Sequence, residues 1–270
     1  MTHRAEGAVV LPKMFFKTSK YAAVLFSLLV VLFFIVSCAS APRVEDVNKA
    51  DTHYKIGVSY LAKDQLKEAF VEFQKAIKLN PKNKNSLNAL GLISTKFKEY
   101  GDAVTYYKRA ISIAPDYSEA MNNLGVTYVN MEEWDEAIKY FKMALKNPLY
   151  LNPERAYSNM GYTFYRKGDY QNAIHILKKA ITRYPDFLRP IYFLGLVYLK
   201  LGETEAAIEE FKKVVNLAPK NIDAHWELAN AYLRTGDGER AVKHFKVVVK
   251  SGADNDRREE AFNYIELLRK

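Results

Sequence analysis

The sequence contains little cysteine, glycine and proline, and each shortage excludes a class of protein. A single cysteine among 270 residues rules out a framework of disulfides within the chain. Twelve glycines and nine prolines are too few for a collagen-like or low-complexity chain. Because 49% of the residues are apolar and 13% are aromatic, the composition predicts a folded protein that is rich in helix.

The sequence also lacks the residue groups that catalysis and metal binding require. It has no glycine-rich phosphate loop, and its one thiol lies at Cys38, in the N-terminal segment described below. The histidines at positions 53, 175, 225 and 244 show no second histidine at metal-ligand spacing, and His225, beside Trp226, is expected to pack. We therefore expect no enzyme, no cofactor and no metal site.

The chain instead carries a pattern that recurs every 34 residues, with one step of 36. Each unit has a small residue at position 8, an alanine at position 20 and apolar residues at helical spacing in both halves. This spacing is that of two amphipathic helices, each with one buried face. The position-8 residues are Gly57, Gly91, Gly125, Gly161, Gly195 and Ala229.

Small residues at positions 8 and 20 let two helices approach closely, and prolines such as Pro115 end the second helix. The pattern resembles the tetratricopeptide repeat through most of the chain. The resemblance implies an all-α fold, a right-handed α-solenoid. We also expect an N-terminal hydrophobic signal helix before it and a capping helix over 254–270 after it, since Ala261, Ile265 and Leu268 lie on one helix face. The six expected repeats are 50–83, 84–117, 118–153, 154–187, 188–221 and 222–253.

The first 37 residues have a different composition from the repeats. A basic segment that begins at Met14 precedes an apolar run over 22–36, and residues 35–38 read Ile-Val-Ser-Cys. This arrangement is typical of an export signal with a lipobox. We expect residues 1–37 to be the signal, and we hypothesise that translation begins at Met14.

The resemblance to bacterial lipoproteins implies cleavage before Cys38 and attachment of lipid to its thiol. Residues 38–49 are then a lipidated tether. No Asp follows Cys38, which favours the outer membrane, with the repeats in the periplasm. An uncleaved membrane anchor is the alternative, because the apolar run is long enough to span a bilayer.

In repeats of this family the first helix of each unit lines the concave groove, at positions 2, 5, 9, 12 and 13. In the second half of the chain these positions combine aromatic rings with arginines, which is typical of protein-binding hot spots. Asn amides in the first half can pair with a peptide backbone. In the alternative, the rings pack against one another and the arginines face water. The expected groove residues are Asn88, Leu92, Asn122, Val126, Asn130, Arg155, Tyr162, Tyr165, Arg166, Arg189, Tyr192, Leu196, Trp226, Asn230 and Arg234.

The third unit ends in an extended segment, Asn-Pro-Leu-Tyr-Leu-Asn-Pro-Glu over 147–154. This segment, six repeats and a lipobox together resemble the type IV pilus biogenesis and stability lipoproteins, the pilotin family. The resemblance implies that the groove binds a segment of the pilus secretin subunit. A general scaffold for outer-membrane protein assembly, or one that recruits cell-wall or polysaccharide machinery, is the alternative. The net charge of +9 is scattered over helix surfaces, so we expect no nucleic acid partner.

Overall fold

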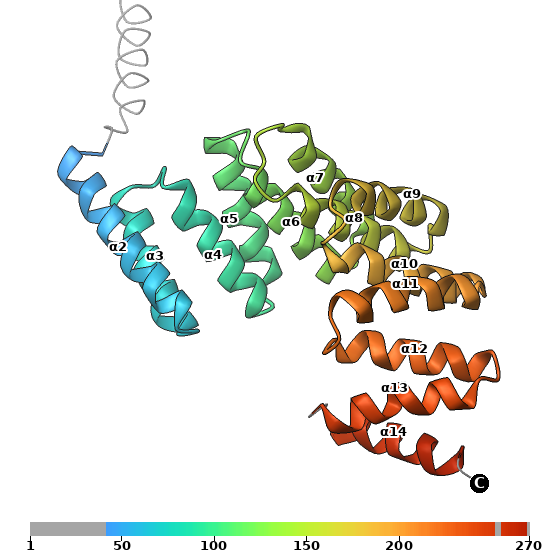
Figure 1. The fold of residues 1–270 in the computed structure, drawn as a ribbon. Coiled ribbons are helices and arrows are strands. Elements are labelled where there is room, and N and C mark those ends of the chain that lie inside the picture. Colours follow the sequence, from blue (N-terminus) through green and yellow to red (C-terminus); the bar gives the residue numbers. More distant parts are fainter. Residues whose placement is uncertain (1–41, 252–254, 269–270) are drawn as a thin grey trace, which may run out of the picture. The chain divides into compact units, whose positions relative to one another are not determined.

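The described residues, 42–251 and 255–268 of a computed structural model, form helices joined by short turns (Figure 1). The expected signal segment, the apolar run and Cys38 lie outside the described residues. Residues 45–270 belong to one compact unit, which holds the helical stack. The thirteen helices of the described residues are α2 (Val44–Ala62), α3 (Leu66–Leu79), α4 (Lys84–Lys96), α5 (Tyr100–Ile113), α6 (Ser118–Asn130), α7 (Trp134–Lys146), α8 (Pro153–Lys167), α9 (Tyr170–Arg183), α10 (Leu188–Leu201), α11 (Thr204–Leu217), α12 (Ile222–Arg234), α13 (Gly238–Lys250) and α14 (Asn255–Leu267).

Successive helices pack against one another as hairpins, and each hairpin packs against the next. Helix α4 packs on α5, α6 on α7, and likewise up to α12 on α13, while α5 contacts α6 and α7 contacts α8. The first helices of neighbouring hairpins also touch, as α4 with α6, α6 with α8 and α8 with α10. We call the surface made by α4, α6, α8, α10 and α12 the first-helix surface. The all-helical stack that the 34-residue period predicted is confirmed.

Each position-8 glycine lies against a large side chain of the second helix of its hairpin, which is an aromatic ring in four repeats and Leu177 at Gly161. A Cβ atom added to Gly125 would lie 2.6 Å from the ring of Phe141, and one added to Gly91 would lie 2.7 Å from Tyr107. Atoms that are not bonded cannot come so close, so a larger residue would push the helices apart. The position-20 alanines, for example Ala137, are fully buried, and the physical reason given for both small positions holds.

The turn between the two helices of each hairpin has one recurring geometry. Position 15 adopts the left-handed conformation each time, at Asp64, Lys98 and Glu132 and at three glycines. The next backbone N–H bonds the carbonyl five residues back, as from Glu99 to Ser94 at 2.9 Å. This 6→1 bond is the Schellman closure of a helix C-terminus. The three glycines are Gly168, Gly202 and Gly236.

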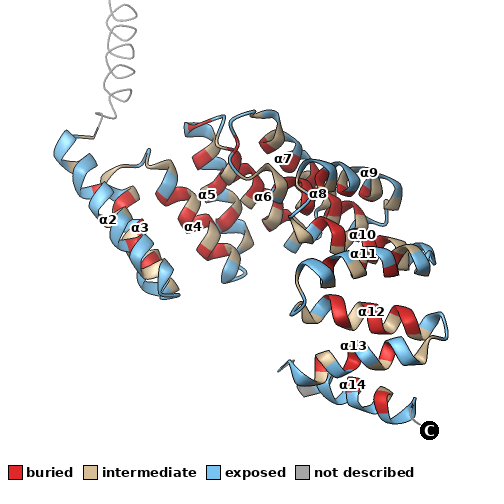
Figure 2. Cartoon of the chain, in the orientation of Figure 1, coloured by how far each residue is buried: buried red, intermediate tan, exposed pale blue. Residues whose placement is uncertain are grey.

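The two ends of the stack show how far the helical region extends. Helix α2 begins at Val44, so residues 44–49, which the sequence assigned to the tether, are helical. At the other end α14 packs on α13, with Ala261 and Ile265 buried (Figure 2) and Tyr264 stacked on Phe245 at 5.1 Å. Helix α14 therefore covers the open apolar face of α13.

Candidate partner-binding surface

The fifteen expected groove residues all lie on the first helices of the hairpins. Helices α4 and α6 carry five of them, and α8, α10 and α12 carry the remaining ten. The structure brings the aromatic members of α8 and α10 into mutual contact. We call Tyr162, Tyr165, Tyr192 and Phe193 the aromatic cluster.

The rings of the aromatic cluster form a continuous row across α8 and α10. The ring centres of Tyr162 and Phe193 are 4.8 Å apart, and those of Tyr162 and Tyr165 are 6.1 Å apart. Tyr192 lies 5.9 Å from Phe193 and 5.7 Å from the buried Phe211. Tilted contacts at these separations stabilise aromatic pairs beyond their buried area. The row is thus fixed to the core at one side while its members remain only half-buried.

Arg166 is held in place by the cluster and does not extend freely into water. It donates a hydrogen bond to the Tyr162 hydroxyl at 2.9 Å, and its guanidinium lies 5.3 Å from the ring centre of Trp134. Glu132 lies 3.5 Å away as an ionic partner. The hydrogen bond to Tyr162 raises the pKa of the Arg166 guanidinium. The rings therefore do pack together, as the alternative expected, but they fix this arginine on the surface.

A hollow opens beside Tyr165, between α8, α10 and α12. Its lining combines a tyrosine and two leucines with one acidic and two basic side chains. Burial raises the pKa of the Glu227 carboxyl and the pKa of the Tyr165 hydroxyl, so both groups are partly removed from water. The lining residues are Tyr165, Leu196, Leu199, Lys200, Glu227 and Arg234.

A second hollow lies at the other end of the cluster, around Arg189. Its guanidinium stacks 5.5 Å from the ring centre of Phe193. Burial lowers the pKa of Arg189, and the neighbouring charge of Arg155 lowers it further. Two neighbouring guanidinium groups, one of them stacked on a ring, are suited to an acidic group of a partner. The lining residues are Leu188, Arg189, Tyr192, Phe193, Asn221 and Asp223.

The asparagines of the first-helix surface differ from the expectation. Asn122 is buried, and its side-chain oxygen accepts a hydrogen bond from Asn159 at 3.1 Å. Asn88 accepts in the same way from Asn123. Because these amides join neighbouring first helices, Asn122 is a packing residue and not an open contact for a peptide; the expectation for it was wrong.

Sequence reasoning missed the residues at position 6 of the repeat. Asn123, Asn159, Phe193 and Glu227 all occupy this position, and each of the first three contacts the first helix of the preceding hairpin. The residue type at position 6 changes from amide to ring to carboxylate along the chain. That change, read beside the neighbouring repeat, is the signal that could have identified them.

The expected residues Trp226 and Asn230 lie at the C-terminal end of the same surface, whereas Leu92, Val126 and Asn130 lie on α4 and α6. Trp226 packs edge-on against Phe245 at 5.6 Å, and the guanidinium of Arg257 lies 5.8 Å from its ring centre. Asn230 donates to the backbone oxygen of Trp226 at 3.0 Å. Arg257 also pairs with Asp223 at 2.6 Å, so α14 contributes a residue to this end of the surface.

Two histidines that stand apart in the sequence meet in the structure. The Nδ1 atoms of His225 and His244 are 2.8 Å apart, a contact that the sequence spacing of the two residues did not predict. Nε2 of His225 lies 3.0 Å from the carbonyl of Pro219 and donates to it, so its Nδ1 accepts from His244. Within the described residues no group of three or more potential ligands could hold a metal ion.

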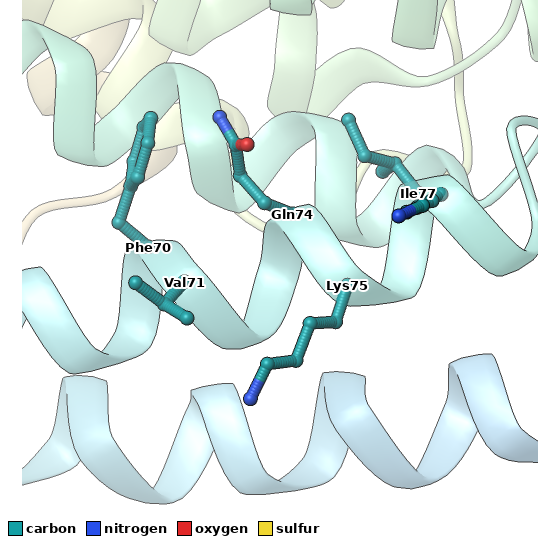
Figure 3. A pocket seen from close by; sticks show the side chains of 6 residues that line it. Phe70, Val71, Gln74, Lys75 and Ile77 are labelled. Carbon is teal, nitrogen blue, oxygen red and sulfur yellow. The ribbon is translucent and has the colours of Figure 1, made fainter.

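Another hollow lies away from the first-helix surface, along α3. Figure 3 shows Phe70, Val71 and Gln74 projecting from that helix. Gln74 donates to the hydroxyl of Tyr106 on α5 at 3.3 Å.

No helix within the described ranges is both long and apolar enough to cross a bilayer.

The fold is shared with several solved structures. The crystal structure of PilW, a widely conserved type IV pilus biogenesis factor, matches with a TM-score of 0.73 at 21% identity, over 79% of this chain and 98% of that one. PilF of Pseudomonas aeruginosa matches with a TM-score of 0.69 at 16% identity, over 81% and 99%. YrrB, a tetratricopeptide-repeat protein with an unusual peptide-binding site, matches with 0.51 at 19% identity, over 71% and 97%. At these identities the likeness shows the fold alone.

No curated protein sequence matches the chain significantly. Family models do match it. Models described as a tetratricopeptide repeat match residues 50–83, 84–149 and 116–186, and one described as a TPR repeat matches 195–236. The family is generally a non-enzymatic scaffold for protein interaction. Together these matches take in more than half of the sequence, and the chain belongs to the tetratricopeptide-repeat family.

Proposed function

We propose that the chain is a non-enzymatic docking protein of the bacterial envelope. It consists of six tetratricopeptide repeats over 50–253 in a right-handed solenoid, and it binds a segment of another protein on the first-helix surface. The bound segment crosses α8, α10 and α12.

The aromatic cluster with its two flanking hollows is the observation that carries this proposal. Half-buried tyrosines that are fixed from behind offer apolar area with little loss of side-chain freedom on binding. Arg189 and Arg234 add charge at either side of the row. Tyrosine, tryptophan and arginine in such a setting are the residue types that dominate binding energy at protein interfaces.

The partner we propose is the secretin subunit of a type IV pilus machine. The Asn-Pro-Leu-Tyr segment at 147–150 and the fold likeness to PilW and PilF support this choice. Lipid on Cys38 holds the protein at the outer membrane, where it assists secretin assembly. A general scaffold for outer-membrane protein assembly or for cell-wall and polysaccharide machinery is the second candidate, because aromatic rows also stack on sugars.

Binding of the full chain to the purified secretin subunit tests the proposal. Replacing Tyr165→Ala and Tyr192→Ala together is expected to weaken binding by at least about tenfold, since hot-spot residues contribute about 2 kcal/mol or more each. The matched control is Tyr106→Ala, which removes a half-buried tyrosine from α5. If the double variant keeps its helical content and binds the secretin with unchanged affinity, the assignment of binding to the first-helix surface is wrong. Binding of glycan strands but not of the secretin would favour the second candidate.

A further inference from the structure

The turn from α7 to α8 presents two leucines to solvent. Leu149 is 82% exposed and Leu151 is 89% exposed, and they are the two most exposed large apolar side chains in the described part of the chain. Single exposed leucines are common on protein surfaces. Two of them within three residues, both almost fully outside the packed structure, contribute nothing to the fold.

The turn holds these leucines outward by fixing the residues around them. Tyr150, between the two, is buried against Met121, Ala144 and Ala156. The Asn147 side chain accepts from the Leu149 backbone N–H at 2.9 Å and donates to the carbonyl of Asp116 at 3.0 Å. Pro148 and Pro153 restrict the backbone on either side. These contacts fix the turn in a conformation that leaves both leucines exposed to solvent.

The chain topology places this turn at one particular edge of the stack. The chain reverses direction within each hairpin and again between one hairpin and the next. All first helices therefore run in the same direction. The α7–α8 turn consequently lies at the edge where first helices begin, which is also the edge where α2 begins (Figure 1). In the sequence, the apolar run over 22–36 precedes α2.

The covalent distance between the proposed anchor and α2 is short. Because α2 begins at Val44, six residue steps separate it from Cys38, and these span at most about 20 Å. A lipid on Cys38 thus keeps the edge where α2 begins within that distance of the bilayer surface. Because residues 44–49 are helical and not part of the tether, the restraint is tighter than the expected tether over 38–49 would impose.

We propose that the turn over 147–152 inserts Leu149 and Leu151 into the surface of the bilayer that carries the anchor. The inference rests on the membrane anchoring put forward under the proposed function. The turn adds a second contact to the one at Cys38, which orients the stack so that the first-helix surface stands at a fixed angle to the membrane. Two weak contacts on one molecule reinforce each other through the high local concentration that the tether imposes.

A bilayer fits the turn better than a protein groove does. A segment between two prolines offers neither a helix face nor a row of backbone groups for a partner to pair with. Lys146 precedes the leucines and is exposed, as in interfacial segments that meet anionic headgroups. Lysines and aspartates both occur in the turns of this edge, as with Lys82 and Asp116, so apolar insertion and not net charge supplies the main attraction.

Fluorescence quenching by brominated lipid tests the proposal on the full chain, purified from membranes and reconstituted into phosphatidylethanolamine–phosphatidylglycerol vesicles. The probe variant is Leu149→Trp. Its matched control is Lys63→Trp, in the exposed α2–α3 turn at the opposite edge. The native background of Trp134 and Trp226 is subtracted with the unaltered chain. Bromines within the outer acyl region are expected to quench the tryptophan at 149 at least about twofold more than the one at 63.

Flotation of the same vesicles separates the two proposals. If the chain floats with the vesicles and quenching is equal at 149 and 63, the anchor stands and the insertion is wrong. If the chain does not float, both are wrong. If the tryptophan at 149 is shielded only after envelope proteins are added, the turn binds a protein and the membrane contact is refuted. Preferential quenching that a further Leu151→Ser change reduces would support the insertion.

Discussion

At the residue scale, position 15 of the repeat shows a conflict between local preference and fold. The turn requires the left-handed conformation there, and the second half of the chain supplies glycine. The first half supplies Asp64, Lys98 and Glu132, whose Cβ atoms make that conformation unfavourable by about 1–2 kcal/mol. The turns are therefore less stable in the first three hairpins than in the last three.

Replacing Lys98→Gly is expected to stabilise the protein by about 0.5–1 kcal/mol, because glycine adopts a positive φ without strain. Lys98 is exposed, with φ of 63°, so the change removes no packing. Denaturant unfolding of the full chain measures the effect. In the matched control, Lys142→Gly in the interior of α7, a loss of about 1 kcal/mol is expected. Destabilisation by both changes would contradict the account of the turn.

The histidine pair gives the C-terminal hairpin a dependence on pH. Burial, then the neighbouring His225, lowers the pKa of His244 to about 4. The unfolded chain takes up a proton near pH 6.5 while the folded chain does not, so stability is unaffected above that pH and falls as the pH drops from 6.5 towards 4. The loss is about 1–2 kcal/mol after allowance for solvent around the half-buried ring.

Thermal unfolding at several pH values checks this prediction. His244→Phe keeps a ring against Tyr232, on which the imidazole stacks at 5.8 Å, and removes the titrating group. This variant should lose less stability than the unaltered chain between pH 7 and pH 4.5. His175→Gln, at an exposed position, should not alter the slope. Equal slopes for the unaltered chain and the His244 variant would show that His244 does not titrate as described.

At the scale of elements, the helices and their pairing follow from sequence, while the turns and the surface contacts between repeats do not. The spacing of apolar residues and the glycine at position 8 predicted hairpins because both report packing within one repeat, as Gly91 against Tyr107 shows. Contacts of position 6, such as Phe193 with Tyr162, depend on the rotation between repeats. A single repeat's pattern does not encode that rotation, and for this reason the burial of Asn122 was missed.

Helix α14 is expected to stabilise the end of the stack by burying a few side chains against α13. Replacing Ile265→Ala should lower the free energy of unfolding by about 2 kcal/mol or more, since the isoleucine is buried and its removal leaves a cavity. Leu267→Ala, at a side chain that is 67% exposed, is the control and should change stability by less than about 0.5 kcal/mol.

Hydrogen exchange locates this effect. In the Ile265→Ala variant, the protection of backbone amides from exchange should fall first in α13 and α14. The stability of each repeat in such an array depends on its contacts with the adjacent repeat. An even loss of protection from α2 to α14 would mean that the array unfolds as a single unit and that α14 has no local capping role.

At the scale of the molecule, the first-helix surface is not uniform. Its α4–α6 part joins neighbouring helices through amide pairs such as Asn88 with Asn123. Its α8–α12 part carries the aromatic cluster and two hollows. The half-buried rings still have area free for a partner, whereas the amides are already used within the fold. Binding is therefore expected to concentrate in the C-terminal half of the surface.

Photo-crosslinking in living cells tests this central claim most directly. A photoreactive phenylalanine analogue is placed at position 192 of the full chain, and a second variant carries it at position 106 on α5 as the control. We predict a specific crosslink from position 192 to a secretin subunit and none from position 106. Crosslinks from position 106 alone, or the same products from both positions, would contradict the assignment of the binding surface to α8, α10 and α12.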